Sequence, residues 1–267
     1  MMSALQNWYD VLPEPKLQHI SPQDFGFITG SINRLLVADI SKLDPQLIFW
    51  IRNLYTDMTA FNVELTEIET YNWLRIKMEN NDQNLMEFLS VYPHKLHVSH
   101  FNLLLPSTET RLVICQMEKA KLLPDRTSVI HLLHHYGHQN DLNSVLNIIF
   151  FTLYDLRINI DAQLIEAFID ALINSDEPKL AMYLLIQICS AYDEQTLPPA
   201  ISLSESQVAV LDYLVSNFVN LEHAQLQQSI RPTAQMLRPF LKYYRSAREK
   251  DTLSALIQLV DKYDIEL

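Results

Sequence analysis

The chain has 267 residues, a formal net charge of −12 at pH 7 and only 3 Gly. The excess of acid disfavours unguided attraction to nucleic acid or to an anionic membrane surface. Few glycines suit helices joined by short turns better than a sheet protein with many glycine turns. The longest apolar run, at 148–156, contains Asp155 and is far shorter than the ~20 residues of a membrane span. We therefore expect an all-α protein without a membrane span.

The segment 1–60 is predicted to form an N-terminal extension and a capping pair of helices. Residues 1–10 resemble neither a secretory signal nor an organelle transit peptide, so the chain is either cytoplasmic or has lost a presequence. Prolines at 13, 15 and 22 predict an extended lead-in over residues 1–22. Helices are then expected from residue 23 to 39 and from Asp44 and Pro45 onward.

A repeat with a period of 36 organises the stretch between positions 122 and 190. Its first apolar quartet recurs 36 positions later, pairing Val129, Leu132, Leu133 and Tyr136 with Ile165, Phe168, Ile169 and Leu172. Its second recurs likewise, pairing Val145, Ile148, Ile149 and Leu153 with Ala181, Leu184, Leu185 and Cys189. Spacing of i, i+3, i+4, i+7 predicts amphipathic helices, two in each copy. Expected helix caps are Asp125, Asp141, Asp161 and Asp176, the last followed by Pro178 in a first turn.

The same register continues toward the C-terminus. Leu237, Phe240, Leu241 and Tyr244 lie two full periods after the quartet that begins at Ile165. We expect helical repeats over 61–190, an acidic proline-containing insertion over 191–206 and further repeats over 207–267, including a first-helix face at 211–218. A unit of this size cannot bury its apolar faces alone, so the repeats predict a right-handed α-solenoid of stacked helix pairs.

Two segments carry a family resemblance. Thr70-Tyr71-Asn72-Trp73-Leu74 and the stretch from Met117 to Pro124-Asp125 resemble the opening and ending of the pentatricopeptide repeat, which has about 35 residues. Ile130 and Glu166 depart from it, standing where the family usually has Asn, Ser or Thr. The resemblance implies binding of single-stranded RNA. It also implies a mitochondrial protein whose presequence has been removed. Such a protein would be similar to the fungal factors that stabilise, process or translate an organellar transcript. Within these factors, the chain resembles the C-terminal module of those that stabilise the transcript of an ATP synthase subunit.

Base-reading positions follow from this resemblance alone. Pentatricopeptide proteins read one base per repeat through side chains near the start of the first helix and at the repeat end. Asn72 and Asn102 match the helix-start reader, and Asp125 and Asp161 match the closing one. Because Asp is also a natural helix cap, Asp125 and Asp161 have a purely structural alternative.

One region reverses the acidic trend. Residues 231–250 hold one acid, Glu249, against six basic residues: Arg231, Arg238, Lys242, Arg245, Arg248 and Lys250. Arg238, Lys242 and Arg245 follow i, i+4, i+7 spacing, and Tyr243 adjoins them. Such a stripe could hold phosphates and stack bases, or it could be a solvated helix face that balances an acidic partner. The positions two periods before Arg238 and Lys242 are Glu166 and Asp170, which would repel a phosphate backbone.

No residue set in the sequence indicates catalysis. His131, His134, His135 and His138 form two i, i+4 pairs, and His94, His97 and His100 recur every third residue, but no acidic or Cys ligand is spaced to complete a zinc site. Motifs that pair a nucleophile with a base or cradle a phosphate are missing. We therefore expect no enzyme, metal, cofactor or small-molecule substrate.

Two further expectations concern the thiols and an alternative function. Cys115 and Cys189 fall on predicted apolar helix faces, which favours buried, reduced thiols over a disulfide. The acidic composition also leaves open a protein-binding α-solenoid, a scaffold or adaptor subunit of a larger complex.

Overall fold

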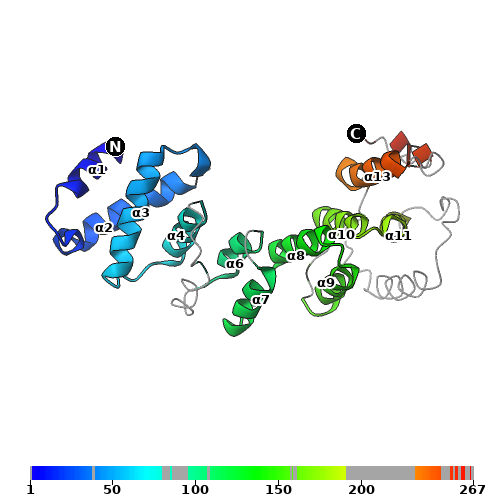
Figure 1. Cartoon of the computed structure of the whole chain (residues 1–267), viewed down its shortest axis with the longest axis horizontal. Coiled ribbons are helices and arrows are strands. Elements are labelled where there is room, and N and C mark those ends of the chain that lie inside the picture. The colour runs from blue at the N-terminus through cyan, green and yellow to red at the C-terminus, as the bar shows by residue number, and fades with distance from the viewer. Residues whose placement is uncertain are drawn as a thin grey trace. The chain divides into compact units, whose positions relative to one another are not determined.

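The computed structural model describes residues 2–37, 40–79, 96–106, 109–156, 161–190 and 232–247, and the single positions 85, 158, 253, 254, 256, 257, 260, 261 and 265. These residues form α-helices and two short 3-10 helices, with no strand among them (Figure 1), which confirms the all-α prediction. The chain divides into two compact units, residues 1–122 and 123–267. The division falls inside the predicted repeat region of 61–190.

The first unit contains six described α-helices: α1 (Met2–Asp10), α2 (Pro22–Leu36), α3 (Pro45–Ala60), α4 (Glu67–Glu79), α6 (Val98–Leu104) and α7 (Thr110–Lys119). The 3-10 helices are η1 (Lys16–His19) and η2 (Ile40–Lys42). The expected extended lead-in is wrong at α1. This segment is helical because Leu5 and Tyr9, at i and i+4, bury on one face, and the Tyr9 hydroxyl donates to Asp57 Oδ2 of α3 at 2.6 Å.

The expected burial of Cys115 is also wrong. In α7, Val113 and Met117 carry the buried face, whereas the free thiol of Cys115 is exposed. Cys115 lies two residues from each of them, and residues two apart point to different sides of a helix. The side chain of Cys189 lies outside the described part of the chain.

The second unit repeats its helix bounds with the period seen in the sequence. Its described helices are α8 (Arg126–His138), α9 (Leu142–Tyr154), α10 (Ala162–Asn174), α11 (Pro178–Ser190) and α13 (Ala234–Ala247). Both bounds of α10 follow those of α8 by one period of 36, both bounds of α11 follow those of α9 by one period, and α13 begins two periods after α10. The predicted insertion at 191–206 and the predicted helix face at 211–218 lie outside the described residues.

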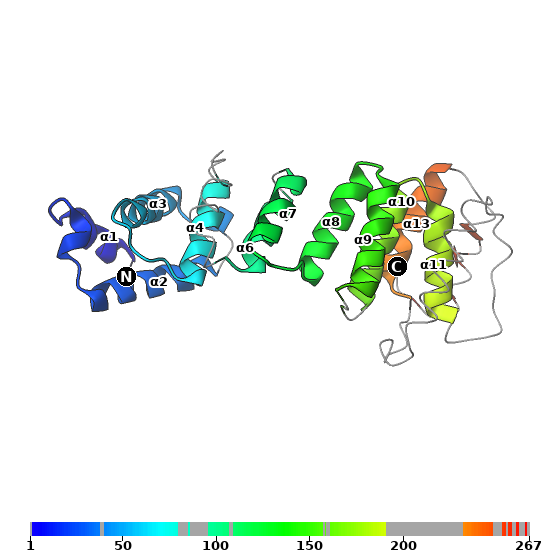
Figure 2. The ribbon, with the colours of Figure 1, turned by 90° about the horizontal axis from the view of Figure 1, so that it is seen from below.

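Helix α10 is the centre of the second unit. It packs against α8, α11 and α13 (Figure 2), and eight of its thirteen residues are buried. The approach to α8 is close at Gly137, where an added Cβ would stand 2.8 Å from the Cα of Ala171. Although α13 comes two periods after α10 in the sequence, it packs directly against α10.

Helix starts in the second unit agree with three of the four predicted caps. The carboxylates of Asp125, Asp141 and Asp161 accept the backbone N–H three residues on, at 2.8, 3.1 and 3.0 Å. Asp176 is not a cap, contrary to expectation. It has a φ of 59° and ends the turn after α10, and Glu177 directly precedes α11.

Within the described ranges, no helix combines the length and the apolar character needed to cross a membrane.

Candidate nucleic-acid interface

The predicted basic stripe lies on one helix, α13. Arg238, Lys242 and Arg245 are all exposed there, and with Leu241 and Ser246 they line a hollow of about 700 Å³. Leu241 is only 7% exposed, so it forms an apolar floor below the charged side chains. The sequence predicts Leu241 only as a core residue, and nothing in its spacing distinguishes a floor from a core position.

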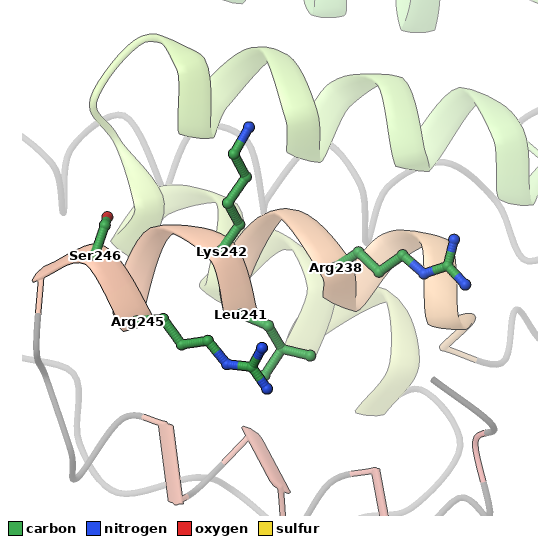
Figure 3. A pocket seen from close by; sticks show the side chains of 5 residues that line it. All are labelled: Arg238, Leu241, Lys242, Arg245 and Ser246. Atoms are coloured by element: carbon green, nitrogen blue, oxygen red, sulfur yellow. The ribbon is translucent and has the colours of Figure 1, made fainter.

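The three cations are spread along the helix rather than gathered at one point. In Figure 3, Arg245 runs beside Leu241, Lys242 points toward the opposite edge of α13, and Arg238 extends toward the start of the helix. Arg245 lies seven positions after Arg238, which is about 10 Å along a helix axis. This spread suits a chain of negative groups better than a single anion, which would need the cations to converge.

The two tyrosines next to the stripe have other contacts. The Tyr243 hydroxyl donates to Asp176 Oδ1 at 2.9 Å, which ties α13 to the turn after α10. Tyr244 is 3% exposed and stacks on Phe240, with ring centroids 6.5 Å apart. Tyr244 is therefore a core side chain, and Tyr243 is half-buried at the packing contact rather than among the residues that line the hollow.

The acidic pair on α10 is partly used in holding α13. Glu166 Oε1 accepts the Thr233 hydroxyl at 2.8 Å, and the Gln235 amide, with its nitrogen turned toward Glu166, donates to Oε1 and Oε2 at 3.2 and 2.9 Å. Asp170 accepts from Asn174 in its own helix, at 3.1 Å. The expected acidic surface is therefore, at Glu166, a contact between helices.

Asp161 takes part in a similar contact, between α8 and α10. Arg126 Nη2, at the start of α8, lies 2.7 Å from Asp161 Oδ2 and donates to Gln163 Oε1 at 2.7 Å. Burial raises the pKa of the Asp161 carboxyl, but the hydrogen bonds from Arg126 and from the backbone N–H groups of Leu164 and Gln163 outweigh it, so the pKa lies below its ordinary value.

These two contacts are made at equivalent positions of α10 and α13. Asp161 directly precedes α10, and Thr233, two periods later, directly precedes α13. Gln163 and Gln235 are likewise two periods apart, in the first turns of α10 and α13. Arg126 of α8 binds Asp161 and Gln163, and Glu166 of α10 binds Thr233 and Gln235. Thr233 and Arg126 were not singled out in the sequence, although Thr233 could have been found by shifting the predicted cap Asp161 by two periods.

The predicted helix-start readers are buried in the first unit. Asn72, in α4, is 4% exposed, and its amide nitrogen donates to Asn33 Oδ1 of α2 at 2.7 Å. Asn102, in α6, is 9% exposed. Asp125 belongs to the second unit, where it caps α8 and shares a capping box with Ser128. The structure thus assigns packing or capping contacts to Asn72, Asp125 and Asp161.

Histidines of the described segments also have local structural roles. The His97 side chain caps α6 by accepting from the Ser99 N–H at 3.4 Å, and His100 Nδ1 accepts from the His97 N–H at 2.9 Å. His100 Nε2 lies 3.1 Å from the Glu67 carbonyl oxygen. Burial, with the neighbouring His134 charge, lowers the pKa of His131. No group of three or more potential metal ligands is found among the described residues.

A second hollow, of about 590 Å³, lies between α1 and α3 in the first unit. Its lining is rich in side-chain amides, from Gln6, Asn7, Gln46 and Asn53, and Asp10 is the one charged residue among the described residues that line it. The described lining residues therefore carry no positive charge that would attract phosphates. The basic hollow on α13 is therefore the better candidate for an anionic ligand.

Comparisons with family models, with curated proteins and with solved structures found no match to this chain.

Proposed function

We propose that this protein is a helical-repeat protein that binds single-stranded RNA through the basic face of α13. The observation that carries the proposal is the set of three exposed cations on one helix face, Arg238, Lys242 and Arg245, around a hollow with an apolar floor. Cations spread along a face suit successive phosphates, and this attraction is local enough to act despite the acidic net charge. The pentatricopeptide-like segments and the repeat period support a right-handed solenoid and a role in mitochondrial transcript stabilisation, processing or translation.

Charge reversal tests the binding directly. The variant Arg238→Glu/Lys242→Glu should lose RNA affinity, measured by fluorescence anisotropy with a labelled single-stranded RNA. Arg111→Glu/Lys119→Glu reverses two exposed charges on α7 and leaves α13 intact, so it serves as the matched control. Equal affinity in the two variants would remove the α13 face from the proposal.

Ultraviolet crosslinking in cells, followed by sequencing of the attached RNA, tests the biological role. Enrichment of one mitochondrial transcript is the expected result. Crosslinked RNA at background level would contradict the proposal.

A second candidate function is a protein-binding scaffold, and the Arg126–Asp161 contact favours it. There an Arg on one helix binds the acidic cap of the next at 2.7 Å. Arg238 could bind an acidic helix start of a partner protein in the same way. A scaffold would co-purify with a defined partner, and nuclease treatment would not release that partner.

A further inference from the structure

The basic face of α13 is equivalent to faces that α8 and α10 use to receive another helix. On α8, Gly137 lies against Ala171 of α10. On α10, Glu166 binds Thr233 and Gln235 at the start of α13. In the repeat register, Gly137 corresponds to Arg245 of α13, and Glu166 corresponds to Arg238. The face with Arg238 and Arg245 is thus the α13 counterpart of the faces on which α8 receives α10 and α10 receives α13.

The residues on this face differ sharply from one helix to the next. Its three positions, at i, i+3 and i+7, are Ile130, Leu133 and Gly137 on α8, Glu166, Ile169 and Ile173 on α10, and Arg238, Leu241 and Arg245 on α13. Leu133, Ile169 and Ile173 are all buried. On α13 only the middle position stays apolar, and both outer positions carry a positive charge.

This change makes the α13 face unfit to receive another apolar helix. Packing a helix there would take the Arg238 and Arg245 guanidinium groups out of water, which is unfavourable unless every charge is paired. A phosphate chain does not require that desolvation, because phosphates and guanidinium groups can remain partly hydrated while they pair.

We propose that single-stranded RNA crosses this basic face of α13, bound through about three phosphates, one for each cation, and without recognition of base sequence. The inference rests on the proposed RNA binding and specifies its ligand as the phosphodiester chain itself. It differs from reading one base per repeat, because the three cations that would bind the phosphates all lie on one helix, α13. Leu241, buried at the floor of the hollow, adds no polar group that would distinguish one base from another.

The salt dependence and the sequence dependence of binding test this mode. With three phosphates neutralised, the slope of log K against log salt concentration should be about −2 for a single strand. Oligomers of U, C and A of equal length should bind within about twofold of one another. Arg245→Gln should reduce the slope by about 0.7, while Arg245→Lys, which keeps the charge, and the control Arg111→Gln should leave it unchanged.

Crosslinking with 4-thiouridine RNA then locates the contact. Crosslinked peptides are expected from α13, residues 234–247. Peptides from α8 or α10, a strong preference for one sequence, or a slope much steeper than −2 would overturn this inference and leave RNA binding itself standing. Absence of RNA binding by the unaltered protein would remove both proposals. If poly-glutamate displaces the RNA at concentrations far below those of competing RNA, the face binds an acidic protein and the inference fails.

Discussion

The guanidinium of Arg126 lies 2.7 Å from the carboxylate of Asp161, and this contact joins the start of α8 to the cap of α10. Asp161 therefore has two structural functions: it caps its own helix through the Leu164 N–H, and it holds the preceding helix through Arg126. Both functions stabilise the second unit without any ligand.

We expect the two functions of Asp161 to separate in a mutant cycle. Asp161→Ala should lower the free energy of unfolding by about 1–2 kcal/mol, because the cap and the ion pair are both lost. Arg126→Met should cost about 0.5–1 kcal/mol, since the pair is partly exposed. Chemical denaturation of the two single variants and the double variant gives the coupling energy. A coupling indistinguishable from zero would show that the ion pair does not stabilise the protein.

Gly137 should tolerate no side chain. Gly137→Ala places a Cβ 2.8 Å from the backbone of Ala171, and we expect it to lower the unfolding free energy by about 1–3 kcal/mol despite the higher helix propensity of Ala. The matched control is Gly30→Ala in α2, where a Cβ meets nothing within 4 Å and stability should rise by up to about 1 kcal/mol. Stabilisation by both substitutions would contradict the close approach of α8 and α10.

Asn72 and Asn33 should behave as a structural pair. Asn72→Ala and Asn33→Ala each leave the other amide without its partner in the 2.7 Å hydrogen bond, so each should cost about 1–3 kcal/mol of stability. Asn33 has no place in the base-reading scheme. RNA affinity measured well below the melting temperature should therefore change equally in both variants, whereas a loss confined to Asn72→Ala would identify Asn72 as a base reader.

The stability of the second unit should fall as the pH is lowered through the range where His131 titrates. Burial, followed by the charge of His134, lowers the pKa of His131 in the folded state, and Asp125 opposes this only in part. A lowered folded pKa means that the unfolded chain binds the proton more readily. The contribution of neutral His131 to the free energy of unfolding is therefore complete above the pKa of the unfolded chain, about 6.5, and decreases below it.

Thermal melts of the unaltered protein and of His131→Gln at pH 7.5 and 5.5 test this effect. The pH-dependent loss of melting temperature should be smaller in the variant, while a change at the exposed His138 should have no such effect. An identical pH response in all three proteins would exclude His131 as its source.

The periodic part of the fold could be predicted because its signals are local. Apolar spacing and the capping residues Asp125, Asp141 and Asp161 predicted the helices that the structure shows, since each signal acts within one turn or a few turns. Predictions were wrong where the local structure depends on a contact distant in sequence. The helix at Tyr9 is an example, because the hydrogen bond from Tyr9 to Asp57 spans 48 residues. The prediction that Asp176 caps a helix was wrong for a different reason. An Asp in the left-handed conformation after α10 cannot be told from the sequence alone from an Asp that caps α11.

The candidate site shows the same difference between features set by one helix and features set by contacts distant in sequence. The spacing of Arg238, Lys242 and Arg245 predicted a shared exposed face, because it depends on one helix only. The burial of Asn72 could not be predicted, because it depends on Asn33 in another helix. The Asp176 partner of Tyr243 lies 67 residues away, and only the folded chain brings the two together.

The direct packing of α13 on α10 also bears on the order in which the second unit assembles. Helices α8 and α10 begin one period apart, so they can meet as soon as that short segment has formed, whereas α13 begins two periods after α10. Each doubling of a connecting loop adds about 0.6 kcal/mol to the entropic cost of closing it, and contacts distant in sequence form more slowly. During synthesis α8–α11 can fold while α13 is still inside the ribosome. The basic face of α13 would then be completed only after the helix on which α13 packs has folded.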